Sequence, residues 1–76
     1  MAVTVYSTPS CSYCRLAKDY LRKHNIPFND YNVANDRAKA DEMVRKSGQM
    51  GVPVLDVNGR ILVGFNPAEI ERALHR

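Results

Sequence analysis

The chain has 76 residues, which leaves room for one small domain over residues 1–76 and excludes a second. With 45% hydrophobic and 25% charged residues, its composition is that of a globular protein and excludes disordered and disulfide-dense classes. Eleven Lys and Arg against eight Asp and Glu give a net charge of +3, too small and too dispersed to indicate nucleic acid as a main partner.

The first half of the chain predicts a strand, a helix and a second strand. Residues 3–7 alternate apolar and polar side chains, and Pro9 follows, which is typical of a strand that ends in a loop. Residues 12–24 have the spacing of an amphipathic helix. Its apolar stripe consists of Cys14, Ala17 and Leu21. Pro27 ends this helix, because proline has no N–H to donate, and residues 28–32 then form a short strand.

The second half predicts a helix followed by a hairpin. Residues 36–47 have helical spacing, and Gly48 is placed to supply the left-handed residue after the helix. Two apolar runs, residues 53–57 and 60–63, flank Asn-Gly at residues 58–59. Asn-Gly is the strongest short-range hairpin signal, because both central residues of a type I′ turn need a positive φ.

A third helix is predicted to begin after Asn66. Asn66 suits an N-cap, Pro67 the first helical position and Glu69 the third. The order is therefore β-α-β-α-β-β-α. A strand-helix-strand opening implies a parallel pair with a right-handed crossover, and the hairpin adds two antiparallel strands. The sequence predicts an α/β fold with a four-stranded mixed sheet flanked by three helices.

Two cysteines lie three residues apart where the first strand meets the first helix. On a first helical turn, the sulfurs of Cys11 and Cys14 come within bonding reach. Cys11 is at the helix start, where unpaired N–H groups and the helix dipole favour a thiolate. Cys14 points inward from the next turn and suits the resolution of a mixed disulfide. Arg15 and Lys18 add positive potential nearby.

Two other interpretations of the cysteine pair are weaker. A structural disulfide that closes so short a loop would add little stability in a reducing compartment. A zinc site would need two more ligands, and the spacing of His24 and His75 matches no zinc pattern. We therefore predict no metal ligands, and we expect His24 to face solvent in the last turn of its helix.

Several segments together resemble the glutaredoxins over nearly the whole chain. Tyr6-Ser7 precedes a Cys-x-Tyr-Cys motif, and residues 47–53, Ser-Gly-Gln-Met-Gly-Val-Pro, look like the family segment that ends in Thr-Val-Pro. The resemblance implies a thioredoxin-like (glutaredoxin) fold. It also implies that Cys11 is the nucleophile and Cys14 the resolving cysteine. By the same resemblance, a cis Pro53 faces the pair, and the Val52 backbone pairs with a bound peptide or glutathione.

The chain departs from the family pattern at three places. Thr8 replaces a lysine that many glutaredoxins carry, and Ser12 replaces the proline inside the cysteine pair. Residues 64–67, Gly-Phe-Asn-Pro, replace the Gly-x-Asp-Asp that grips the amine end of glutathione. This segment is closer to the Gly-Phe-Arg-Pro of the ribonucleotide reductase redoxins, which are reduced by thioredoxin reductase. The resemblance therefore leaves two electron donors open, glutathione and a flavoprotein reductase.

Five further residues are candidates for contact with glutathione or a peptide. Tyr13, flanked by both thiols, is expected to form one wall of the substrate groove, with packing on the helix flank as its alternative. Gln49 is expected to reach the glycine carboxylate of glutathione, as its family counterpart does. The segment Gly64, Phe65 and Asn66 opens the last helix, whose N-terminus suits a carboxylate. Phe65 as a core residue and Asn66 as an N-cap are the alternatives.

The sequence as a whole favours a dithiol-disulfide oxidoreductase that needs no resident cofactor. It would reduce disulfide-containing or glutathionylated proteins through Cys11 and Cys14, with glutathione as co-substrate or a flavoprotein reductase as donor. The alternative is a carrier of a [2Fe-2S] cluster bridged by Cys11 of two chains and two glutathione thiols. Ser12 keeps this open, because family members that hold clusters often lack the proline. Visible absorption after anaerobic purification would distinguish the two.

The remaining expectations concern location and partners. No apolar run approaches the roughly 20 residues that span a bilayer, and the first residues lack the features of a signal peptide. We therefore expect a cytoplasmic monomer that binds no membrane. A nucleic-acid module is disfavoured, because the sequence has no aromatic stacking array and no concentrated basic face.

Overall fold

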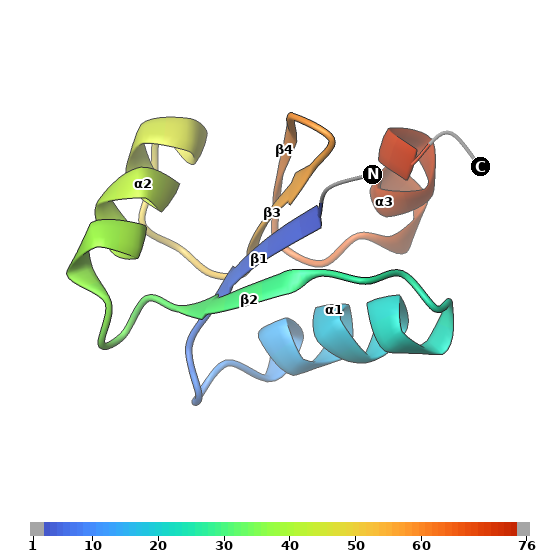
Figure 1. The fold of residues 1–76 in the computed structure, drawn as a ribbon, viewed down its shortest axis with the longest axis horizontal. Helices are drawn as coiled ribbons and strands as arrows, with labels where there is room; N and C mark the ends of the chain where they lie inside the picture. The colour runs from blue at the N-terminus through green and yellow to red at the C-terminus, as the bar shows by residue number, and fades with distance from the viewer. Residues whose placement is uncertain (1–2, 75–76) are drawn as a thin grey trace.

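The computed structural model describes residues 3–74, which form seven helices and strands in the predicted order (Figure 1). These are β1 (Val3–Ser7), α1 (Ser12–Lys23), β2 (Asn29–Asn32), α2 (Arg37–Ser47), β3 (Val54–Val57), β4 (Arg60–Val63) and α3 (Pro67–Leu74). The second and third strands each begin one residue later than the sequence predicts. His75, named in the search for zinc ligands, lies outside the described residues.

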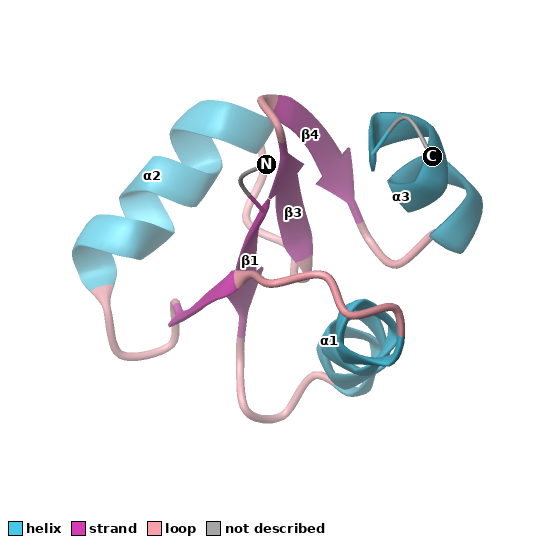
Figure 2. Cartoon of the chain, turned by 45° about the vertical axis from the view of Figure 1, so that its right-hand side comes forward, coloured by secondary structure: helices cyan, strands magenta, loops and turns pink. Residues whose placement is uncertain are grey.

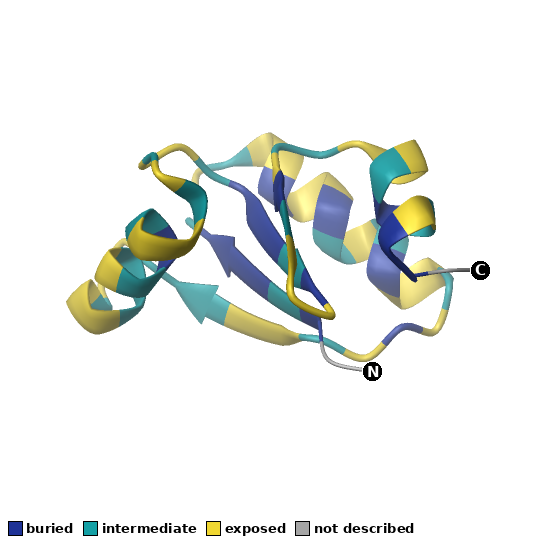
Figure 3. Cartoon of the chain, turned by 90° about the horizontal axis from the view of Figure 1, so that it is seen from above, coloured by how far each residue is buried: buried dark blue, intermediate teal, exposed yellow. Residues whose placement is uncertain are grey.

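The sheet is four-stranded and mixed, in the order β2-β1-β3-β4, as predicted. β1 pairs in parallel with β2 and antiparallel with β3, and β3 pairs antiparallel with β4. Helix α2 lies on one face of the sheet, and α1 and α3 lie on the other (Figure 2). The central strands β1 and β3 are largely buried, whereas the edge strand β2 carries exposed and half-buried residues (Figure 3).

The sheet separates two apolar clusters. The larger lies under α1 and α3 and joins their buried faces to the inward side chains of the strands. It contains Val3, Val5, Ala17, Leu21, Ile26, Leu55, Val57, Leu62, Ile70, Ala73 and Leu74. The smaller lies under α2 and contains Tyr6, Met43 and Val54. Cys14 belongs to the same buried stripe of α1 as Ala17 and Leu21. The packing of this stripe on the larger cluster therefore also buries the Cys14 thiol.

Backbone conformations at two turns confirm the sequence signals. Gly48 follows α2 with φ +75°, the left-handed conformation that glycine adopts without steric cost. Asn58 and Gly59 have φ values of 54° and 91°, as a type I′ turn requires. The turn aligns β3 and β4 in register, with Val57 opposite Arg60. Within residues 3–74, no helix combines the length and the apolar character that a membrane crossing needs.

Candidate active site

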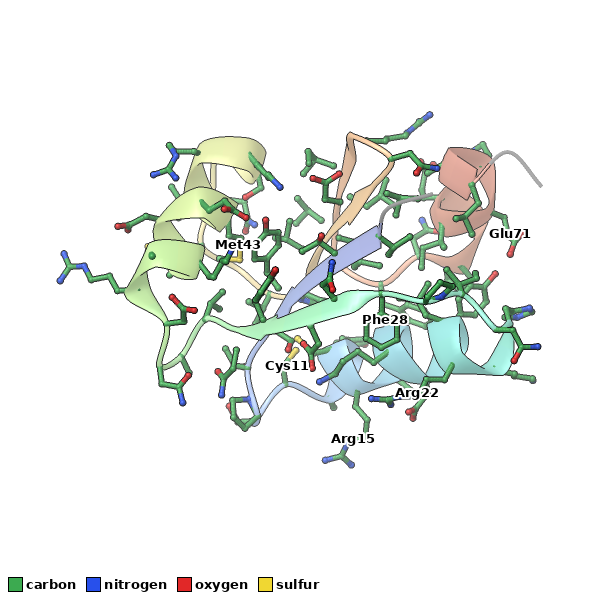
Figure 4. The ribbon with its side chains drawn as sticks, in the orientation of Figure 1. Cys11, Arg15, Arg22, Phe28, Met43 and Glu71 are labelled. Carbon is green, nitrogen blue, oxygen red and sulfur yellow. The ribbon has the colours of Figure 1, made fainter. Side chains whose placement is uncertain are left out.

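Cys11 is the N-cap of helix α1, as the sequence predicts. Its φ and ψ are −94° and 113°, and its sulfur accepts the backbone N–H of Cys14 at 3.1 Å. An oxygen of Ser, Thr, Asp or Asn usually fills this role, and here the Cys11 sulfur takes its place. Cys11 is half-buried at the start of α1, while the exposed Arg15 points away from the sheet (Figure 4).

Cys14 is fully buried one turn further along α1. Burial raises the pKa of its thiol to about 11, and the hydrogen bond with Cys11 adds to the rise. A backbone hydrogen bond of Thr8 and the positive charge of Lys18 lower the pKa of Cys14, but by less. Both cysteines are free thiols. At neutral pH the Cys14 sulfur therefore carries its proton, which suits a thiol that reacts only after the first cysteine has done so.

The segment before β3 faces the cysteine pair. The Val52–Pro53 peptide bond is cis, as the resemblance implies. The Val52 carbonyl oxygen lies 3.8 Å from the Cys11 sulfur, within range of a weak hydrogen bond from the thiol. Pro53 is buried, and its carbonyl accepts the N–H of Gly64 at 2.8 Å. The site therefore joins the start of α1, the segment before β3 and the end of β4.

The Gln49 side chain forms hydrogen bonds within its own loop. Its side-chain oxygen accepts the N–H of Gly51 at 2.7 Å, and its amide nitrogen donates to the Gly51 carbonyl at 3.0 Å and to the Ser47 hydroxyl at 3.3 Å. The amide thereby holds both backbone groups of Gly51. A contact between Gln49 and a glutathione carboxylate requires the amide to give up some of these bonds.

The segment before α3 serves the fold. The Asn66 side-chain oxygen accepts the N–H groups of Ala68 and Glu69, at 3.1 and 3.3 Å, so the predicted N-cap is confirmed. Phe65 is half-buried against the larger apolar cluster, and its ring lies edge-on to that of Tyr20 with centroids 6.0 Å apart. Phe65 therefore packs on the core and Asn66 caps helix α3, which are the two structural alternatives predicted for this segment.

The family model of the glutaredoxins (Glutaredoxin) matches residues 3–62 of the chain. The chain belongs to the glutaredoxin family. It is 46% identical over 74 residues to the uncharacterized glutaredoxin-like 8.6 kDa protein in the rubredoxin operon of Clostridium pasteurianum, covering 97% of this chain and 99% of that protein. It is 33% identical over 70 residues to the glutaredoxin-like protein NrdH of Lactococcus lactis subsp. cremoris, covering 92% and 96%.

Solved structures support the same fold. The glutaredoxin-like NrdH-redoxin from Escherichia coli is 29% identical, with a TM-score of 0.83 over 100% of this chain and 97% of that one. The glutaredoxin from Archaeoglobus fulgidus is 18% identical, with a TM-score of 0.89 over 100% and 89% of the two chains. The predicted glutaredoxin fold and the redox-active cysteine motif are thus confirmed.

In this glutaredoxin, several large apolar side chains are exposed on the two segments that form the site. Tyr13, between the cysteines, is 63% exposed, and Met50, two residues before Val52, is 79% exposed. Leu16 is 48% exposed and lies one helical turn after Tyr13 on the same face of α1. The sequence interpretation missed Leu16 and Met50. The spacing of Leu16 from Tyr13 was a usable signal, whereas the exposure of Met50 depends on the loop that Gln49 holds.

His24 differs from its prediction. It ends helix α1 as the C-cap, but it is half-buried, and its ring centroid lies 4.4 Å from that of Tyr20. The aromatic neighbour, one turn earlier on the helix, keeps the imidazole against the protein. In the part of the glutaredoxin that spans residues 3–74, no three His, Cys, Asp or Glu side chains are grouped to hold a metal ion.

Proposed function

We propose that this glutaredoxin is a dithiol-disulfide oxidoreductase for protein disulfides and glutathione mixed disulfides. The Cys11 thiolate attacks one substrate sulfur, a mixed disulfide forms, and the other substrate sulfur leaves and takes a proton from water. Cys14 then loses its proton to solvent and attacks the Cys11 sulfur, which releases the second substrate sulfur. Two electrons pass to the substrate, and the Cys11–Cys14 disulfide awaits reduction by an external donor.

The unequal environments of the two thiols are the observation that carries this proposal. Cys11 is half-buried and receives an N–H hydrogen bond at the start of a helix, whereas Cys14 is fully buried with a pKa raised to about 11. The nucleophile in thiol-disulfide exchange is the thiolate. Cys11 is therefore suited to the first attack, and Cys14 to the intramolecular second one.

The substrate is proposed to lie beside Val52 and Tyr13. An extended segment placed next to the Val52 backbone brings its sulfur to Cys11, because the Val52 carbonyl is 3.8 Å from the Cys11 sulfur. The exposed ring of Tyr13 offers an apolar wall on the helix side. Main-chain pairing of this kind accepts many sequences, which suits a reductase for more than one protein.

The physiological electron donor is proposed to be a flavoprotein reductase, with glutathione as an inefficient co-substrate. Thr8 and Asn66 are uncharged where many glutaredoxins place charged contacts to glutathione, and Phe65 packs on the apolar cluster. Each lost charge-assisted contact costs about 1.5 to 3 kcal/mol in a partly buried site and less when exposed. Two losses weaken glutathione binding by roughly one to three orders of magnitude.

The comparisons support the same choice of donor. The relative from Lactococcus lactis carries the name NrdH, and the structure of the Escherichia coli NrdH-redoxin is described as the basis of a thioredoxin-like activity profile. Both are similar to this chain along nearly its whole length.

A turnover assay with two donors tests the function and the donor separately. A disulfide substrate is offered to the protein with NADPH and thioredoxin reductase, or with NADPH, glutathione and glutathione reductase. We expect faster turnover with thioredoxin reductase. Faster turnover with glutathione would overturn the proposed donor. If neither donor supports turnover above that of the Cys11→Ser variant, the oxidoreductase function is wrong.

A further inference from the structure

A chain of polar contacts joins the end of β1 to β2 and to helix α1. The hydroxyl of Ser7, which is 2% exposed, donates to one carboxylate oxygen of Asp30 at 2.8 Å. The other carboxylate oxygen accepts the Lys18 ammonium at 3.0 Å. Side chains of Lys18 and Asp30 are 20% and 38% exposed. With a buried third partner, this pair is more restricted than an ion pair between freely exposed side chains, which contributes little.

Both ends of this chain of contacts lie at the resolving cysteine. Lys18 follows Cys14 by four residues, which places it one turn later on the same face of α1. At the other end, Ser7 directly precedes Thr8, whose backbone hydrogen-bonds Cys14 and whose carbonyl accepts the N–H of Cys11 at 3.3 Å. The contacts therefore reach the surroundings of Cys14 from the helix and from the strand.

We propose that Lys18, held by Asp30 and Ser7, is a positioning residue for the resolving step, in which its positive charge favours the Cys14 thiolate that attacks Cys11. This inference rests on the proposed function and deepens it. In that step the Cys14–Cys11 bond forms, the bond from Cys11 to the substrate sulfur breaks, and the Cys14 proton goes to water.

The electrostatics of Cys14 agree with this geometry. Burial and the hydrogen bond with Cys11 raise the pKa of Cys14, and the charge of Lys18 acts in the opposite direction. The groups that face Cys14 are Cys11 and Lys18 on its own helix and the Thr8 backbone after β1, with Asp30 of β2 behind Lys18. The Asp30 carboxylate also keeps the Lys18 side chain from extending into solvent.

The expected size of the effect follows from two opposing factors. If removal of the Lys18 charge lowers the thiolate fraction of Cys14 about tenfold at neutral pH, the more basic thiolate regains about threefold in intrinsic nucleophilicity. The resolving step then slows by about threefold. The first attack by Cys11 changes less, because Lys18 lies about 10 Å from Cys11 along the helix axis and only about 6 Å from Cys14.

Stopped-flow kinetics with dithiobis(nitrobenzoate) separate the two steps. Attack by Cys11 releases one coloured thionitrobenzoate at a rate that depends on reagent concentration. Attack by Cys14 releases the second in a phase that does not. We expect Lys18→Met to slow the second phase by about threefold and to leave the first phase and the thermal midpoint nearly unchanged. Lys18→Arg, which keeps the charge and can still bind Asp30, should restore the second phase.

A matched control lies on the same helix. Lys23 is an exposed cation nine residues after Cys14, about 13 Å further along the helix axis, so Lys23→Met removes the same charge at a distance. A second phase of wild-type rate in Lys18→Met, or an equal slowing in Lys23→Met, would overturn the inference. A wild-type protein that shows no second phase would instead refute the proposed function.

Discussion

The ionisation of the buried thiol leads to a quantitative prediction for single-cysteine variants. Cys11→Ser leaves Cys14 as the one thiol and keeps a side chain suited to the N-cap, and Cys14→Ser leaves Cys11. In the wild-type protein, with a pKa of about 11, only about one Cys14 side chain in ten thousand is a thiolate at pH 7. An ordinary cysteine, with a pKa of about 8.5, has about three in a hundred.

The thiolate fractions differ by roughly 300-fold, but the more basic sulfur is intrinsically more nucleophilic by roughly tenfold. The Cys11→Ser variant keeps burial, the largest cause of the raised pKa of Cys14, but loses the contribution of Cys11. Cys14 in this variant should therefore react with iodoacetamide several-fold, and at most about 20 to 30 times, more slowly than a cysteine in an unfolded peptide. Burial of the Cys14 sulfur slows the reaction further, because the reagent must reach it. Cys11 in the Cys14→Ser variant should react at least as fast as the peptide thiol.

Alkylation rates followed by mass spectrometry from pH 6 to pH 10 check this prediction. The rate for Cys14 should still be rising above pH 9, since burial keeps the pKa of Cys14 above that of an ordinary cysteine. In a denaturant, the two variants should react alike. The argument fails if folded Cys14 reacts as fast as Cys11 at neutral pH, or if the Cys14 rate levels off below pH 9.

Three further predictions concern stability and donor choice. Lys46→Met removes an ammonium that binds Asp56 at 2.7 Å and the Tyr6 hydroxyl at 2.9 Å, and should cost about 1 kcal/mol in urea unfolding; an unchanged free energy of unfolding would show that solvent screens these contacts. Asn66→Asp keeps the cap and adds a carboxylate, so glutathione-coupled efficiency should rise about threefold to tenfold, and a fall would contradict the proposed loss of anchors. Stability of the reduced protein should fall from about pH 8.5 toward pH 11, because the unfolded chain releases the Cys14 proton at about pH 8.5 and the folded chain at about pH 11. Cys14→Ala should lack this part of the fall in urea midpoints, and an identical pH dependence would contradict the assigned pKa.

The fold could be predicted because its boundaries depend on local backbone chemistry. A positive φ occurs at Gly48, Asn58 and Gly59. Glycine and asparagine are the residue types that favour this conformation, so it could be predicted from the sequence alone. The cysteine spacing likewise fixes both thiols on one helical turn. Such features involve neighbours within a few residues, so the order of elements and the placement of Cys11 and Cys14 at the start of α1 could be predicted before any tertiary contact was known.

The features missed by the sequence depend on how distant segments pack. The Ser7–Asp30–Lys18 contacts need the parallel register of β1 with β2 and the packing of α1 on that face, none of which has a sequence motif. The Gln49 amide forms hydrogen bonds with Gly51 in its own loop. A glutamine at this position is equally consistent with a ligand contact, so the sequence could not distinguish the two. Phe65 could be placed on the core only once its contact with Tyr20 was seen.

Trapping of the mixed disulfide tests the central claim most directly. The reduced Cys14→Ser variant is mixed with a disulfide-bonded peptide, and the product is digested without reductant and analysed by mass spectrometry. We expect a stable adduct in which Cys11 is linked to one peptide cysteine, whereas the wild-type protein should release both peptide thiols and become two hydrogens lighter through its Cys11–Cys14 disulfide. The absence of an adduct on Cys11, or a wild-type protein that keeps the peptide bound, would contradict the proposed roles of Cys11 as the nucleophile and Cys14 as the resolving cysteine.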